Sequence, residues 1–287
     1  MRIRVVDAFA HRPFTGNPAG VVILDPEDGA GAAGFPEESW LQHVAAEVNL
    51  SETAFAHPLP PGGEADWALR WFTPTTEVDM CGHATLATAH VLHSTGAISG
   101  TVRFAARCGV LSATAHDDGT ITLDFPTSPL TPVPVPDGVA KALGARVLAG
   151  YDTAAHIGDL VVELADEDTV RGLTPDIPAL VGFAERGIIA TAVAGRPNTG
   201  RAQEAEGDYD FVSRCFFPRV GIDEDPVTGS AHTALAPLWS ERLGRTELTG
   251  LQASARSGLV RTSLRGERTL LTGRSFTVID GELLTAP

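Results

Sequence analysis

The stretch that decides the fold occurs twice in this chain of 287 residues. Arg70-Trp71-Phe72-Thr73-Pro74 is matched by Arg214-Cys215-Phe216-Phe217-Pro218, and each copy is typical of a strand that ends at a proline. An acidic loop follows in both copies. A glycine then opens an Ala-rich helix, Gly82-His83-Ala84-Thr85 in the first copy and Gly229-Ser230-Ala231-His232 in the second. A repeated strand–loop–helix unit predicts a duplicated α/β fold.

A proline-rich segment separates the two copies. Five prolines lie between Asp124 and Asp137, a density that is typical of neither a helix nor a central strand. We therefore expect an N-terminal half over residues 1–125 and a C-terminal half over 126–274, joined by a linker. A second polar stretch, residues 195–207, is expected to be an exposed loop inside the C-terminal half.

Hydrophobic spacing predicts the other elements around the first copy. Strands are expected over residues 2–9, 21–24 and 69–72, with a turn over 16–20. Apolar residues recur at helical spacing over 36–48, which predicts an amphipathic helix. Residues 84–92 are apolar on nearly every side, as in a buried helix.

Composition excludes several classes of function. The formal net charge is -15, which disfavours partners such as nucleic acid or an anionic membrane surface. No apolar run approaches the roughly 20 residues that a membrane span needs, and the first ten residues do not resemble a signal peptide. The three cysteines predict neither a disulfide framework nor a zinc cluster. A cytoplasmic protein is the expectation.

The two helix starts are candidates for binding an anionic substrate. The N-terminus of a helix presents unpaired N–H groups and a partial positive charge, which attract carboxylates. Two such ends facing one cleft would suit a small carboxylate, with His83 and Ser230 beside it. The alternative is purely structural, with Ser230 as a helix cap and His83 as a buried polar residue.

Glu52 is a candidate acid–base residue. It lies between an amphipathic helix and the apolar stretch Ala54-Phe55-Ala56, so partial burial would let its carboxyl group exchange a proton near neutral pH. The structural alternative is an exposed loop glutamate or a helix-capping one.

Asp225 and Cys81 are further candidates, each with a structural alternative. Asp225 ends an acidic loop before Gly229, where it could orient a substrate, hold a metal or complement the helix dipole. No set of histidines accompanies this loop, so no metal is expected. Cys81 precedes Gly82, where a helix N-terminus can favour a reactive thiolate, although such a cysteine is more often a small buried residue.

Five blocks of the chain, in this order, resemble the PhzF-like phenazine biosynthesis isomerases. They span residues 7–231 and are listed here: Asp7-Ala8-Phe9 with Phe14-Thr15-Gly16-Asn17-Pro18-Ala19-Gly20-Val21-Val22; Asn49-Leu50-Ser51-Glu52-Thr53-Ala54-Phe55; Arg70-Trp71-Phe72-Thr73-Pro74; Cys81-Gly82-His83-Ala84-Thr85-Leu86-Ala87; and Asp225-Pro226-Val227-Thr228-Gly229-Ser230-Ala231. The resemblance implies the fold of diaminopimelate epimerase, with two pseudo-symmetric α/β halves. Each half is a curved, mostly antiparallel sheet wrapped round a central helix. The resemblance also implies that a strand near 275–287 completes the first half.

The resemblance implies chemistry without a cofactor. In the phenazine enzyme a glutamate moves a proton along a cyclohexadiene amino acid, and the matching residue here is Glu52. The supporting catalytic residues match His83, Asp225 and Ser230. The substrate-binding positions match Asn17, Cys81, Gly82 and Gly229, and the two glycines contribute backbone N–H groups near the substrate carboxylate. A homodimer is implied by the family alone.

Two other functions stay open at this point. The related epimerases use two cysteines, and only Cys81 stands at such a place here, so an amino-acid epimerase that uses Cys81 is one alternative. The other is a metabolite-binding protein without catalytic activity. The sequence does not identify the substrate.

Overall fold

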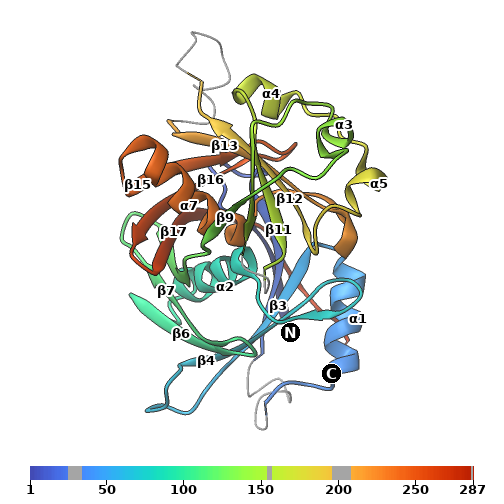
Figure 1. Ribbon diagram of the computed structural model, residues 1–287. Helices are drawn as coiled ribbons and strands as arrows, with labels where there is room; N and C mark the ends of the chain where they lie inside the picture. Colours follow the sequence, from blue (N-terminus) through green and yellow to red (C-terminus); the bar gives the residue numbers. More distant parts are fainter. Residues whose placement is uncertain (25–33, 154–156, 196–207, 286) are drawn as a thin grey trace. The chain divides into compact units, whose positions relative to one another are not determined.

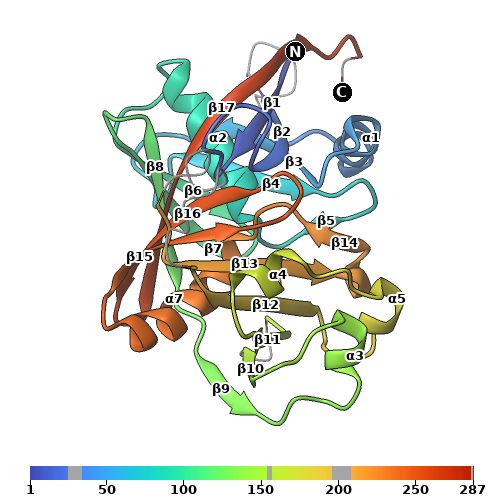
Figure 2. The ribbon, with the colours of Figure 1, turned by 90° about the horizontal axis from the view of Figure 1, so that it is seen from above.

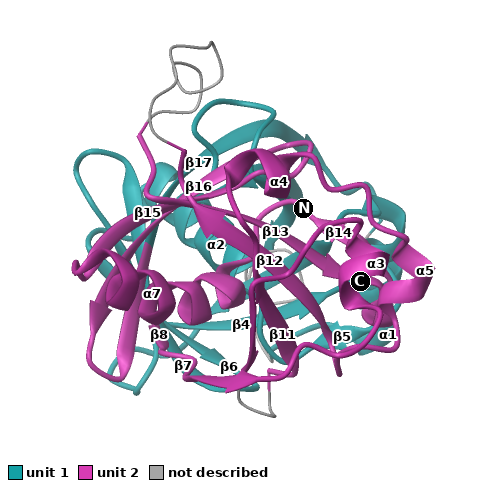
Figure 3. Ribbon diagram, turned by 45° about the horizontal axis from the view of Figure 1, so that its top comes forward, with its two compact units in different colours: residues 1–124, 272–287 teal, residues 125–271 magenta. Residues whose placement is uncertain are grey.

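The computed structural model describes residues 1–24, 34–153, 157–195, 208–285 and 287. Two units divide the chain, one of residues 1–124 with 272–287 and one of residues 125–271 (Figure 3). The boundaries expected from the sequence fall after residues 125 and 274, close to these. Most of the expected loop at 195–207 lies outside the described residues. No helix in the described part of the chain is long and apolar enough to cross a membrane.

In the described residues, unit 1 consists mainly of strands, several of which Figure 1 labels. Its strands are β1 (Arg2–Ala8), β2 (Asn17–Ile23), β3 (Glu52–Pro58), β4 (Trp67–Phe72), β5 (Glu77–Val78), β6 (Thr101–Ala106), β7 (Gly109–Ala115), most of β8 (Thr120–Pro126) and most of β17 (Arg268–Glu282). Its helices are α1 (Glu38–Val48) and α2 (Gly82–Ser94).

Unit 2 repeats this construction with more short helices. Its strands are β9 (Leu130–Val133), β10 (Ala149–Thr153), β11 (Asp159–Glu163), β12 (Gly187–Val193), β13 (Phe211–Phe217), β14 (Ile222–Asp225), β15 (Glu247–Gln252) and β16 (Gly258–Arg265). Its helices are α3 (Val139–Leu143), α4 (Glu167–Arg171), α5 (Ile177–Leu180), the 3-10 turn η2 (Pro218–Val220) and α7 (Gly229–Leu243).

Strand pairing shows that the two units are copies of one topology. In unit 1, β2 pairs with β3 and β4 with β6 in parallel, whereas β1–β2, β3–β4, β4–β5, β6–β7 and β7–β8 are antiparallel. In unit 2, β11–β12 and β13–β15 are parallel, whereas β10–β11, β12–β13, β13–β14 and β15–β16 are antiparallel. Counted from β1 in unit 1 and from β10 in unit 2, the long helix follows the fifth strand. The predicted fold class, two mostly antiparallel sheets each with a central helix, is confirmed.

The C-terminal strand belongs largely to unit 1. Residues Ser275–Glu282 of β17 pair antiparallel with Ala8–Arg2 of β1, and Figure 2 shows the two strands side by side. This is the strand that the resemblance places in the first half.

Alternating side chains give the unit 2 sheet two apolar faces. On β12, Ile188 and Ala190 face one cluster, whereas Ile189 faces the other. On β13, Phe216 joins the first cluster and Phe211 joins the second, which α7 covers. Because successive side chains of a strand point to opposite faces, a sheet covered on both sides is apolar at consecutive positions.

Packing in unit 1 fixes the two elements that bear the site. Helix α2 is buried along nearly its whole length, as its apolar sequence predicts, and it packs against β1, β2, β3 and β7. Helix α1 places Leu41 and Val44 in a cluster with Phe55 of β3 and Phe72 of β4, whose rings lie edge to face at 5.7 Å.

Two local predictions are wrong, and the segment that is expected to be a linker contains a strand. The proline-rich segment includes β9, where Pro132 lies opposite Tyr151 of β10; β10 is the only strand recorded beside β9 among the described residues. A proline lacks an N–H group, but an edge strand has one side on which none is needed. Residues 17–20 belong to β2 rather than to a turn, and Pro18 precedes the part of β2 that pairs with β3. The expected loop before Gly229 contains the short strand β14.

Candidate active site

Glu52 is the first residue of β3 and reaches that place through a short connection from α1. The helix ends at Val48 and is capped by Asn49, whose φ of 52° is left-handed and whose N–H donates to the carbonyl of Ala45. Three residues later, Glu52 lies opposite Ala19 in the parallel ladder of β2 and β3. Its side chain is only 12% exposed, so the predicted partial burial is confirmed.

His83 is the second residue of α2 and faces this carboxylate. The Nε2 atom of His83 lies 3.2 Å from Oε2 of Glu52. Burial lowers the pKa of His83 from 6.5 to about 3, because an imidazolium there would lose its hydration. The imidazole is therefore neutral at pH 7, and the Glu52–His83 contact is not an ion pair of two full charges.

The orientation of the Asn17 amide indicates which nitrogen of His83 carries the proton. The hydroxyl of Ser51 donates to Oδ1 of Asn17 at 3.4 Å, which leaves the Asn17 amide nitrogen 3.3 Å from Nδ1 of His83. An amide nitrogen only donates, so Nδ1 accepts and the ring proton resides on Nε2. The ring proton is thus carried by Nε2, the atom that lies 3.2 Å from Oε2 of Glu52.

Cys81 completes this set of side chains. It is the N-cap residue of α2, is 6% exposed, and its Sγ lies 3.5 Å from Nδ1 of His83. Gly82 follows as the first residue of the helix, where N–H groups have no partner within the helix. The sequence predicts no metal; one donor atom each from Glu52, Cys81 and His83 nevertheless lie within 4.8 Å of one another, so the geometry allows one.

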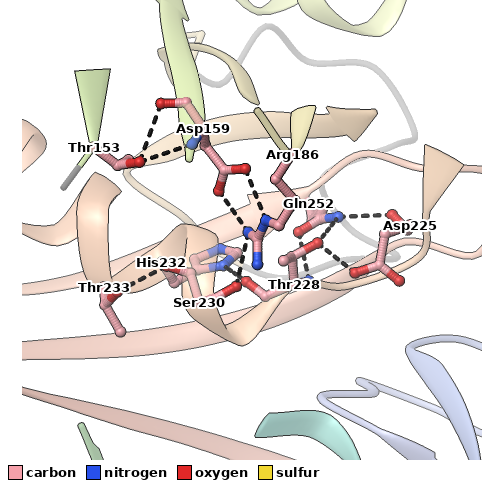
Figure 4. A network of polar contacts seen from close by, with 9 residues as sticks. All are labelled: Thr153, Asp159, Arg186, Asp225, Thr228, Ser230, His232, Thr233 and Gln252. Carbon is pink, nitrogen blue, oxygen red and sulfur yellow. Dashed lines mark hydrogen bonds and ion pairs between the residues drawn. The ribbon is translucent and has the colours of Figure 1, made fainter. Parts of the chain in front are cut away.

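Asp225 is buried in unit 2 within a network of its own (Figure 4). The hydroxyl of Thr228 donates to Oδ2 of Asp225 at 2.5 Å. Gln252 donates through Nε2 to the Asp225 carbonyl and to the Thr228 hydroxyl, and its Oε1 accepts from the Thr228 N–H. These bonds fix the carboxylate just before α7.

Ser230 is the second residue of α7 and follows Gly229, the first. The N-cap is Thr228, so Ser230 is not the capping residue. Its hydroxyl accepts a hydrogen bond from Nη2 of Arg186 at 3.0 Å. Arg186 itself is held by both carboxylate oxygens of Asp159, whose side chain is fully buried (Figure 4).

The structure brings the predicted residues together in two sets. Asn17, Glu52, Cys81, Gly82 and His83 meet in unit 1, and Asp225, Gly229 and Ser230 meet at the start of α7 in unit 2. That both sets serve one substrate stays a prediction, as do the individual catalytic roles.

Sequence reasoning missed four residues of the unit 2 network: Asp159, Arg186, Thr228 and Gln252. The first two lie on segments that the recognised repeat does not reach, since it begins at β4 and β13. If the repeat is extended back to β3 and β12, the start of β12 corresponds to Glu52 at the start of β3. This correspondence would have drawn attention to Arg186, which directly precedes β12.

Comparisons with known proteins give one consistent result. The family model described as phenazine biosynthesis-like protein matches residues 6–281. An uncharacterized isomerase of Pseudomonas aeruginosa is 44% identical over 279 residues, which is 97% of this chain and 96% of that protein. An uncharacterized isomerase of Halalkalibacterium halodurans is 40% identical over 289 residues and covers 98% of both chains.

Solved structures agree with the sequence comparisons. A PhzF family protein from Enterococcus faecalis superposes with a TM-score of 0.86 at 37% identity, over 99% of both chains. A hydroxyproline epimerase from Agrobacterium vitis superposes with a TM-score of 0.55 at 14% identity, over 98% of this chain and 91% of that one. The second likeness concerns the fold alone.

Proposed function

Since the chain belongs to the phenazine biosynthesis-like (PhzF) family of isomerases, we propose that it moves a proton within a small unsaturated or cyclic amino-acid-like metabolite, with Glu52 as the acid–base residue. The observation that carries the proposal is the buried contact of 3.2 Å between Glu52 and a neutral His83. A carboxylate beside an N–H group, shielded from water, is suited to transferring a proton to and from carbon.

The reaction balances on one carboxylate. Glu52 takes a proton from a carbon next to the unsaturated system, and the electron pair of that C–H bond spreads into the conjugated bonds. The carboxylic acid then returns the proton to another carbon of the same system. His83, whose Nε2 lies 3.2 Å from Oε2 of Glu52, stays beside the carboxylate while it is charged, and the N–H groups at Gly82 receive the substrate carboxylate.

An amino-acid epimerase is the second candidate, because Cys81 contacts His83 at 3.5 Å. Two-base racemisation needs a second base on the opposite face of the carbon. The residue of α7 that corresponds to Cys81 is its N-cap Thr228, whose hydroxyl is committed to Asp225. Cys215 is fully buried, and burial raises the pKa of its thiol well above the ordinary value. These observations favour the single-carboxylate reaction.

The test is an isotope experiment with matched variants. The protein is incubated with dihydro-hydroxyanthranilate in deuterated water, and mass spectrometry and NMR follow deuterium in the product. Glu52→Gln keeps the shape of the side chain and should lower turnover by about 10²–10⁴-fold. Glu47→Gln, at an exposed position of α1, should retain turnover.

Each result has a distinct meaning. Full turnover by Glu52→Gln removes the proposed mechanism, and loss of turnover in Cys81→Ala together with inversion at Cα favours the epimerase. A wild-type protein that turns over neither this compound nor a panel of other unsaturated amino acids, yet binds one of them tightly, is a binding protein.

A further inference from the structure

The repeated topology gives every residue of the unit 1 site a counterpart in unit 2. Phe72 and Phe216 match in the repeat, and the ladders place them opposite Thr53 of β3 and Ile188 of β12. The residue before Thr53 is Glu52, so the counterpart of Glu52 is the residue before Ile188, Gly187. Unit 2 therefore has no carboxylate at the place where unit 1 has its acid–base residue.

The packing around Gly187 leaves no space for a side chain at this position. A Cβ atom at Gly187 would lie 2.2 Å from the carbonyl oxygen of Phe216 and 2.3 Å from the ring of Phe217. Real Cβ atoms do not approach other atoms so closely, so a glutamate cannot occupy this position in the present packing. The polar group nearest to it along the chain is the guanidinium of Arg186.

Arg186 is held rigidly although it carries a full charge. Asp159 accepts from its Nε at 2.8 Å and from its Nη2, and the guanidinium lies 4.6 Å from the centre of the Phe217 ring. Thr153 in turn fixes the backbone N–H of Asp159 at 2.8 Å (Figure 4). Desolvation raises the pKa of Asp159, and Arg186 opposes this shift only in part. The buried ion pair therefore contributes little to the stability of the fold.

This arginine determines what the Ser230 hydroxyl can do. Nη2 of Arg186 donates to Ser230 Oγ at 3.0 Å, which uses the hydroxyl as an acceptor. Among the described residues, the Ser230 hydroxyl has no hydrogen-bond acceptor of its own, and the side chain is partly exposed. A hydroxyl that accepts from a cation is polarised and becomes a stronger donor.

We infer that Arg186 is a positioning residue, anchored by Asp159, that makes the Ser230 hydroxyl a dedicated hydrogen-bond donor to an acceptor oxygen of the substrate. The inference rests on the proposed function and adds a ligand class to it: the group bound at Ser230 is a carboxylate or carbonyl oxygen, not a donor such as an ammonium group.

A double-mutant cycle in binding tests this inference. The probe is 3-hydroxyanthranilate, an aromatic compound with the carboxylate and hydroxyl of the diene substrate but with no proton to shift. Arg186 alone cannot be removed safely, because the buried Asp159 would be left unpaired. The cycle therefore compares wild type, Ser230→Ala, Asp159→Asn/Arg186→Met, and all three changes together, by calorimetric titration.

If Arg186 acts through Ser230, Ser230→Ala and Asp159→Asn/Arg186→Met should each weaken binding of the probe about tenfold. This is the scale of one charge-assisted hydrogen bond. The combined variant should then be no weaker than Ser230→Ala within about twofold. Changes in the thermal midpoint, by contrast, should be additive, because the stability of the ion pair does not depend on the serine. Arg186→Lys should restore part of the affinity lost in the methionine variant.

Three results overturn the inference. These are losses that multiply in the combined variant, an unchanged affinity in Asp159→Asn/Arg186→Met, and a wild-type protein that does not bind the probe. The deuterium experiment with Glu52→Gln is read separately. If the wild type turns over the substrate but the binding losses of the variants multiply, the proposed function stands and the role of Arg186 does not.

Discussion

His83 couples the stability of the fold to pH. Its pKa is about 3 in the folded protein against 6.5 in the unfolded chain, so between these values the unfolded chain binds more protons. The contribution is fully present above pH 6.5 and is lost as the pH falls toward 3, at about 1.4 kcal/mol for each unit of pKa difference. Urea unfolding at pH 7 and pH 4.5 should therefore show a smaller pH-dependent loss for His83→Gln than for wild type.

The matched control is His116→Gln, since His116 is exposed on a turn. This variant should follow the wild-type pH dependence. If His83→Gln also follows it, burial does not lower the pKa of His83, and the ring is charged in the folded protein at pH 4.5.

Asn17 should matter through the position of one proton. In Asn17→Asp, a carboxylate would stand 3.3 Å from Nδ1 of His83 and would accept from it, which moves the ring proton away from Nε2 and Glu52. Turnover should fall by about 10²–10⁴-fold. Steady-state kinetics on the substrate of the deuterium assay measure the turnover number. The control is Asn49→Asp, at an exposed helix end, which should behave as wild type.

Equal loss of turnover in both variants would contradict the tautomer argument, because Asn49 does not contact His83. Retained turnover in Asn17→Asp would do so as well.

The pairing of β12 with β13 depends on a glycine. The carbonyl of Phe216, which a Cβ at Gly187 would meet at 2.2 Å, lies in the ladder between these strands and cannot move without disrupting it. Gly187→Ala should destabilise the protein by about 3 kcal/mol, as other overpacked substitutions do. Chemical denaturation measures the change.

Gly182→Ala is the control for this element. A Cβ at Gly182 meets no atom within 4 Å, and the residue does not need a left-handed backbone. The substitution should shift the free energy of unfolding by less than about 0.5 kcal/mol. If the two alanine variants are equally stable, β12 and β13 can accommodate a Cβ atom at Gly187, and the argument from packing is wrong.

The charge of the whole molecule predicts a salt effect. A net charge of -15 makes the folded chain repel itself at pH 7, and exposed ion pairs offset little of that repulsion. Raising KCl from 0.05 to about 0.5 M should increase the thermal midpoint, because screening shortens the range of the repulsion. The increase should vanish near pH 4.9, where the net charge is close to zero. An increase of the same size at both pH values would mean that charge repulsion is not the cause.

The sequence by itself determined the duplicated α/β class, the buried helix α2, the membership of the family and the residues that gather around Glu52. It could do so because apolar periodicity and short motifs are properties of neighbouring residues. The homodimer stays a prediction, since it follows from the family alone.

The tertiary structure decided what local patterns cannot express. Only the folded chain shows that Asn17 sets the tautomer of His83 across 66 positions of sequence, or that Asp159 and Arg186 reach Ser230. Strand pairing also admitted Pro132 at an edge, against its propensity. Burial and hydrogen bonding between distant residues depend on the register of the ladders, and that register is fixed only when the two sheets form.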